Sequence, residues 1–207
     1  MNKITVQDTK IGIKDVLMVL HETGNTTEDC ISSIQTALIY NTSLPLKDCK
    51  AKFDNIKKQE FLLTEKVTDI ISNDQSVEQY VTLPGHFSRI ASNIEKLNEL
   101  VDKKNQGNIL FSDKAVNEAI FLLQRLIEML RPATDMILAR NIFLSTYVQK
   151  SQTGLSKMAD EYATLHEERL VTGECNPVAS SLYLNMLDQI KSIAWHIKEI
   201  TVKLAAD

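Results

Sequence analysis

The stretch DQIKSIAWHI, residues 188–197, follows the same pattern as SRIASNIEKL, residues 88–97, which lies one hundred positions earlier in the chain. The matching positions continue beyond the two stretches and comprise the pairs Ile90/Ile190, Ser92/Ser192, Leu97/Ile197, Glu99/Glu199, Leu100/Ile200 and Lys103/Lys203. An offset of one hundred residues is far longer than the period of a single helix. It therefore indicates an internal duplication, in which the second half of the chain repeats the pattern of the first.

The composition favours an all-α fold built from a few long helices. Hydrophobic residues make up 43% of the 207 positions, which is enough for a folded core. Only six glycines and four prolines are available for turns, and a many-stranded sheet would need more of them. The sequence therefore predicts long helices separated by short loops.

Apolar residues recur at steps of three, four or seven along most of the chain, for example at Leu46, Cys49, Phe53 and Ile56. This spacing places one apolar stripe on one face of a helix. The stripes are nearly heptad, which is typical of helices that pack at shallow angles in an antiparallel bundle. The predicted helices are 13–41, 46–73, 76–104, 113–139, 141–172 and 177–205.

The duplication groups these helices into two three-helix repeats, approximately 13–104 and 113–205. We expect a single domain over residues 1–207, built as two tandem antiparallel three-helix bundles. Three interior features are expected to kink helices, because glycine and proline weaken helical hydrogen bonding. They are Gly24-Asn25, Pro84-Gly85 and Pro132.

Charge and cysteine usage exclude several classes of protein. The net charge of −4, from 23 basic and 27 acidic residues, provides no basic stripe for nucleic acid. No apolar run reaches the ~18 residues of a membrane span, and the N-terminus does not read as a secretory signal. Three cysteines without a CxxC pair favour a reducing compartment. We therefore expect a cytoplasmic chain, with association at the inner face of the membrane through a partner as an alternative.

Signatures of catalysis are missing from the sequence. No histidine has a glutamate three residues before it, as di-metal helical oxidases and ferritins require. Phosphate-binding glycine loops, nucleophile elbows and H-E-x-x-H zinc motifs are also missing. We predict that the protein is not an enzyme and has no organic cofactor.

Two polar rows follow from i, i+4 spacing on the repeated stretches. One row contains Asp188, Ser192 and His196, and the other contains Ser88, Ser92 and Lys96. Such rows are either solvated faces that flank an apolar stripe or parts of a binding site.

The duplicated three-helix pattern, with a repeated motif on its third and sixth helices, resembles the PhoU family of phosphate-uptake regulators. Members of that family carry E-R-I-G-D-H-A-x-N-I at this place, and residues 88–97 and 188–197 match it in frame but in degenerate form. A more specific likeness is H-x-x-R-L-x-x-G-x-C, which begins at His166 and ends at Cys175 and is followed by Tyr183 and Leu187. That segment is similar to the cytoplasmic PhoU-like domains of bacterial sodium/phosphate cotransporters.

The resemblance implies a regulator that acts through contacts with a phosphate transporter or a phosphate-responsive kinase, standing alone or as a cotransporter domain, with a possible homodimer. It also implies metal clusters on acidic residues at the positions of Ser88, Ser92, Asp188 and Ser192. Three of these positions are serines here, and hard cations need charged oxygens. The first site should therefore hold no metal.

The second repeat retains Asp188 and adds His196, so these two residues are the candidate metal ligands. They lie eight residues apart, roughly 12 Å along a helix, and would need help from Asp160 or Glu161. Two other interpretations remain open at this point: a generic helical-bundle adaptor or dimerisation module, and a metal-binding bundle.

Overall fold

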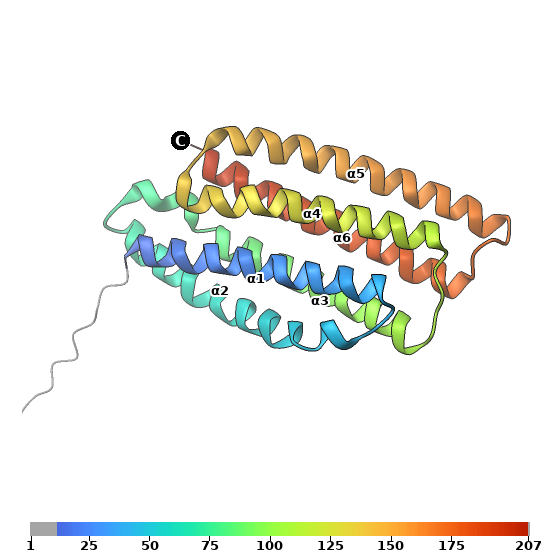
Figure 1. Ribbon diagram of the computed structural model, residues 1–207. Helices are drawn as coiled ribbons and strands as arrows, with labels where there is room; N and C mark the ends of the chain where they lie inside the picture. The colour runs from blue at the N-terminus through green and yellow to red at the C-terminus, as the bar shows by residue number, and fades with distance from the viewer. Residues whose placement is uncertain (1–11, 207) are drawn as a thin grey trace, which may run out of the picture.

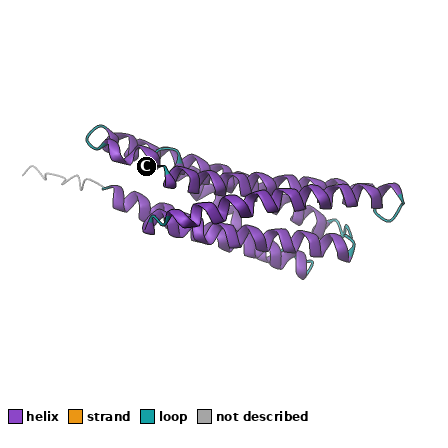
Figure 2. Cartoon of the chain, turned by 90° about the horizontal axis from the view of Figure 1, so that it is seen from above, coloured by secondary structure: helices purple, strands orange, loops and turns teal. Residues whose placement is uncertain are grey.

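The computed structural model describes residues 12–206, and within this range every regular element is helical (Figures 1 and 2). This confirms the predicted all-α fold with its two three-helix halves. The elements are α1 (Ile13–Ile39), η1 (Leu44–Leu46), α2 (Cys49–Ile71), η2 (Gln75–Tyr80), α3 (Leu83–Gln106), α4 (Asp113–Ala139), α5 (Ile142–Val171) and α6 (Pro177–Ala205).

The first half differs from the predicted boundaries at two prolines. Pro45 lies in the short 3₁₀ helix η1, so α2 begins at Cys49 rather than at 46. Residues 75–80 form a second 3₁₀ helix, and Pro84 lies in the first turn of α3 instead of kinking a longer helix. Proline fits the first turn because the amide hydrogen that it lacks has no helical partner there. Pro132, by contrast, lies inside α4.

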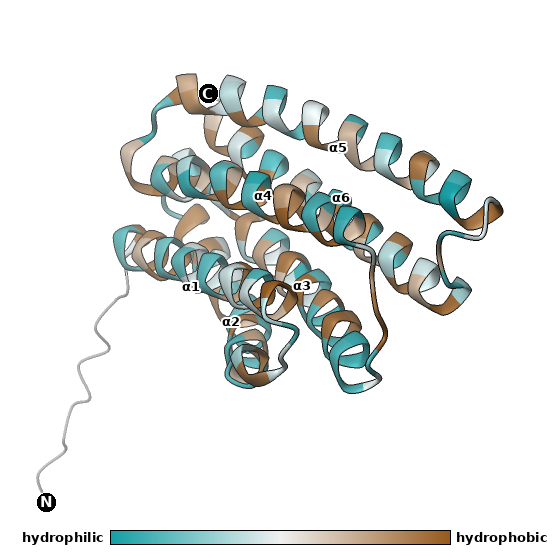
Figure 3. Ribbon diagram, turned by 45° about the vertical axis from the view of Figure 1, so that its right-hand side comes forward, coloured by the Kyte–Doolittle hydropathy of each residue, from teal (hydrophilic) through white to brown (hydrophobic). Residues whose placement is uncertain are grey.

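The two halves are joined face to face along their length. Helix α1 packs against α4, and α3 packs against α6, while α2 and α5 lie on opposite outer sides (Figure 1). The apolar faces of the helices form one continuous core that contains residues of all six long helices. Figure 3 shows hydrophobic and hydrophilic residues alternating around each helix, as expected when one face is buried.

Gly24 permits the close approach of α1 and α4. A Cβ atom at this position would lie 2.2 Å from Oγ1 and 2.6 Å from Cγ2 of Thr134, well inside van der Waals contact. The glycine therefore serves interhelical packing, and α1 continues through it without ending.

Between residues 12 and 206, no helix combines the length and the apolar character needed to cross a membrane.

Candidate functional site

The serines of the two repeated stretches lie along α3 and α6, where the two halves meet. Ser92 on α3 donates its hydroxyl hydrogen to the carbonyl oxygen of Ser88, at 3.0 Å. Asn93 donates from Nδ2 to the hydroxyl oxygen of Ser192 on α6, at 2.9 Å. The hydroxyl of Ser92 is thus bonded within α3, and that of Ser192 is bonded across the α3–α6 contact.

His196 also faces α3, where it meets a residue that the sequence did not single out. Its Nδ1 atom lies 3.1 Å from Nδ1 of His86, and the His196 side chain is only 7% exposed. Burial, the His86 ring and the Arg89 guanidinium together lower the pKa of His196 to about 4. Burial likewise lowers the pKa of His86. Both rings are therefore neutral at pH 7, and one donates a hydrogen bond to the other.

Asp188 lies in a different environment on the same helix. Its carboxylate is exposed and forms an ion pair with Lys191, with 3.1 Å between Oδ1 and Nζ. The same ammonium donates a hydrogen bond to Oδ1 of Asp160 on α5, at 2.9 Å. Both carboxylates raise the pKa of Lys191, and the hydrogen bond to Asp160 has the larger effect. Glu161 pairs instead with Lys157 at 3.8 Å.

The structure therefore does not bring Asp188 and His196 together. Asp188 belongs to an exposed α5–α6 ion-pair group, whereas His196 belongs to the buried α3–α6 contact. In the part of the chain that is described, no three His, Cys, Asp or Glu side chains converge in a way that could hold a metal ion.

The segment from His166 to Cys175 contributes to a buried polar cluster. Arg169, near the end of α5, donates to both carboxylate oxygens of Glu118 on α4, at 2.9 and 3.3 Å. The Tyr183 hydroxyl on α6 donates to the same carboxylate at 2.6 Å. All three residues are buried, so the cluster joins the three helices of the second half through charge-assisted hydrogen bonds. Burial and the Glu118 carboxylate raise the pKa of Tyr183, so its hydroxyl remains protonated.

The glycine of this segment ends helix α5. Gly173 has φ +78°, a left-handed conformation that side chains disfavour. Its amide donates to the carbonyl of Leu170, and the amide of Glu174 donates to that of Arg169. This is the usual way in which a glycine terminates a helix, and it turns Glu174 and Cys175 back toward the bundle.

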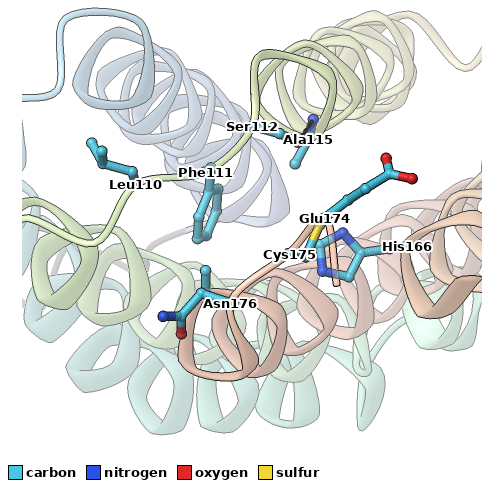
Figure 4. A pocket seen from close by; sticks show the side chains of 9 residues that line it. Leu110, Phe111, Ser112, Ala115, His166, Glu174, Cys175 and Asn176 are labelled. Carbon is cyan, nitrogen blue, oxygen red and sulfur yellow. Dashed lines mark hydrogen bonds between the residues drawn. The ribbon is translucent and has the colours of Figure 1, made fainter. Parts of the chain in front are cut away.

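A pocket of about 230 Å³ adjoins this cluster at the end of the bundle. Figure 4 shows Leu110 and Phe111 on one side of it and His166, Glu174 and Cys175 on the other. The His166 ring lies with its centroid 4.5 Å from that of Tyr183, and the residue is only 2% exposed.

Neither ring nitrogen of His166 has a hydrogen-bond partner among the described residues. Burial, together with the nearby Arg169, lowers the pKa of this histidine. A neutral imidazole can accept one hydrogen bond and donate another. His166 therefore lines the pocket as a neutral ring whose hydrogen-bonding capacity is unused within the described residues.

Glu118 and His86 are among the site residues that the sequence did not predict. A signal for Glu118 exists, because it lies between Ala115 and Leu122 on the apolar stripe of α4, where a charge needs a buried partner. His86 carries no comparable signal. Its partner, His196, lies 110 residues away on α6. The sequence repeat does not show which side of α6 faces α3.

No protein-family model matches the sequence, and no curated protein matches it either. Among solved structures, the crystal structure of PhoU from Pseudomonas aeruginosa is similar to this chain, with a TM-score of 0.85 and 14% sequence identity. The superposition covers 93% of this chain and 94% of the other. The chain therefore has a PhoU-like fold, as the repeated motif predicted.

Proposed function

We propose that this chain is a non-enzymatic, PhoU-like regulator of phosphate transport or of phosphate-responsive signalling. The observation that carries the proposal is the agreement of fold with PhoU from Pseudomonas aeruginosa over 93% of the chain. A match over 93% of the chain must include most of both repeats, so it extends well beyond a single helical hairpin. A regulator of this type works in the cytoplasm through contacts with a transporter or a kinase.

We also propose a closer relation to the soluble domains of sodium/phosphate cotransporters, on the basis of the H-x-x-R-L-x-x-G-x-C segment in the second half. The H-x-x-R-L-x-x-G-x-C residues act together in this fold: Arg169 binds Glu118, Gly173 ends α5, and His166 and Cys175 line one pocket. A segment whose residues all contribute to one local structure is a better guide to relationship than scattered identities.

Exposed apolar side chains on the two outer helices suit a protein that acts by contact. Phe61 on α2 is 75% exposed, and Phe143 at the start of α5 is 81% exposed. Surface aromatic residues of this kind are frequent anchors in protein interfaces. The same surfaces could pair two copies of the chain, and light scattering on the purified protein distinguishes a homodimer from a monomer.

Deleting the gene in its host and measuring uptake of radiolabelled phosphate, at low and at high external phosphate, tests the proposal. We expect uptake to lose its response to external phosphate, and the intact gene to restore it. A double variant Phe61→Ser, Phe143→Ser should fold normally yet fail to restore the response. If uptake responds normally in the deletion strain, the chain is a helical adaptor unrelated to phosphate.

Metal binding by Asp188 and His196 is a separate candidate property. The two side chains have different partners, which argues against a shared ion, and we propose that the protein works without a metal or other cofactor. Elemental analysis of protein purified without chelator is the direct check. Stoichiometric metal that disappears in Asp188→Ala would establish the metal-binding alternative.

A further inference from the structure

A second pocket, of about 430 Å³, lies where the two halves are connected. Its lining residues lie at the end of the bundle where α1 and α3 finish and α4 begins, and Figure 1 shows how these helix ends are arranged. Its lining comes from both halves and from the linker between them, and it comprises Leu38, Ile39, Asn41, Lys104, Leu110, Phe111, Asp113, Val116 and Asn117.

Lys104 is the unusual member of this lining, because a lysine is rarely so deeply buried. The residue is only 4% exposed. Its ammonium donates to the side-chain oxygens of Asn41 at 2.6 Å and Asn105 at 3.2 Å, and it lies 5.4 Å from the centre of the Phe111 ring. Two of its three hydrogens are thus used, and the third has no oxygen partner within the described residues.

Among the residues that the structure describes, the Lys104 ammonium also has no counter-ion. Within residues 12–206, no carboxylate oxygen lies within 4 Å of its nitrogen. Amide oxygens and an aromatic ring provide dipoles but no opposite charge, and a buried charge is normally paired. Burial accordingly lowers the pKa of this lysine.

We propose that this pocket binds the oxyanion group of a small molecule, a carboxylate or a phosphate, with Lys104 as its counter-ion. The first turn of α4 lines the same pocket through Asp113 and Val116, and the partial positive charge at the start of a helix favours an anion there. Leu38, Ile39 and Leu110 would contact an apolar part of the ligand.

Asp113 opposes an anion, but its effect is the weaker one. Its side chain lines the pocket but is exposed, so water screens its charge, whereas Lys104 is buried in a region of low dielectric constant. The attraction from Lys104 therefore exceeds the repulsion from Asp113.

Occupation of the pocket would couple the two halves, since Leu38 and Lys104 belong to the first half and Val116 to the second. The inference stands on Lys104 and its surroundings and does not depend on the regulatory function proposed above.

Calorimetric titration of the full chain tests the proposal, with inorganic phosphate, acetate and hexanoate as probes and matched sodium chloride as the blank. We expect saturable binding of at least one probe. Lys104→Met should weaken it by about tenfold to a hundredfold, the equivalent of one charge-assisted hydrogen bond. The matched control is Lys103→Met, which removes an adjacent exposed lysine and should leave binding unchanged.

Asp113→Asn offers an independent check that does not disturb the core, and it should tighten binding severalfold because the repelling charge is removed. Binding of phosphate alone would identify a phosphate ligand, and preference for hexanoate over acetate would identify a carboxylate with an apolar tail. The proposal is overturned if no probe binds above the chloride blank, or if Lys104→Met and Lys103→Met have equal effects.

Discussion

Individual side chains in this protein carry charge in places where the fold depends on it. Glu118, Arg169 and Lys104 are buried charged residues, and His196 is buried as a neutral ring. Each has a hydrogen-bond partner far away in the sequence. Periodicity predicted which faces of the helices are buried, but it could not predict these partners. They lie 51 to 110 residues apart in sequence and meet only when the helices pack.

The His86–His196 contact should make stability depend on acid pH. Because the pKa of His196 falls from 6.5 to about 4 on folding, the folded state favours the neutral ring. Its contribution, about 3 kcal/mol, is fully present above pH 6.5 and is lost as the pH falls toward 4. The charged groups around the pair are Arg89, Glu199, Lys198 and Lys203.

Urea unfolding at pH 7.5 and at pH 4.5 measures this effect. We expect His196→Gln to flatten the dependence, because glutamine does not titrate. His21→Gln, which changes a histidine on α1, serves as the control and should leave the dependence as it is. An unchanged slope in His196→Gln would assign the acid sensitivity to other groups.

Glu118→Gln should destabilise the protein strongly. The substitution leaves the Arg169 guanidinium buried without a carboxylate, which typically costs about 3–5 kcal/mol. Tyr183→Phe removes only one hydrogen bond to the same carboxylate and should cost about 1–2 kcal/mol. Chemical denaturation compares the two variants with Glu161→Gln, whose ion pair with Lys157 is exposed and should contribute little. Equal losses in Glu118→Gln and Glu161→Gln would contradict the structural role of the cluster.

At the scale of the helix, the sequence was a good guide. The last three helices were predicted within one residue at each end. The structure gives the physical reason for these ends, because side-chain oxygens of Ser112, Asn141 and Asn176 cap the helix starts and the left-handed Gly173 ends α5. The error at residues 75–80 arose because the apolar spacing continues across η2, while the main-chain break is set by Pro84 in the first turn of α3.

The sequence predicted a helix kink at Gly24, but the structure shows that Gly24 lets α1 pack closely against Thr134 of α4. This contact can be tested by substituting both residues. Gly24→Ala should destabilise the protein by about 1–3 kcal/mol, because its methyl group would overlap the Thr134 side chain. Thr134→Ala removes the two closest atoms and should recover most of that loss in the double variant. Melting temperatures of the two single variants and the double variant measure the coupling. Simple additivity of the two changes would show that α1 and α4 do not meet as described.

At the scale of the whole molecule, the internal duplication suggests two bundles, but the packing joins them into one core. The apolar faces of α1 and α3 are buried against α4 and α6 of the other half. A half that unfolded alone would expose the facing surface of its neighbour to water, at a cost proportional to the apolar area. We therefore expect the full chain to unfold in a single cooperative transition.

Trp195 provides a local probe for this prediction, because it is the single tryptophan and lies on α6 in the second half. Phe53→Ala perturbs only the first half: it removes a side chain that is 1% exposed on α2 and should cost about 3–5 kcal/mol. If the halves unfold together, the denaturation midpoint seen by Trp195 fluorescence must fall as far as the midpoint seen by far-UV circular dichroism. A fluorescence midpoint that stays at its wild-type value would show that each half unfolds on its own. In that case, a ligand bound at the pocket between the halves could not transmit its effect through a shared core.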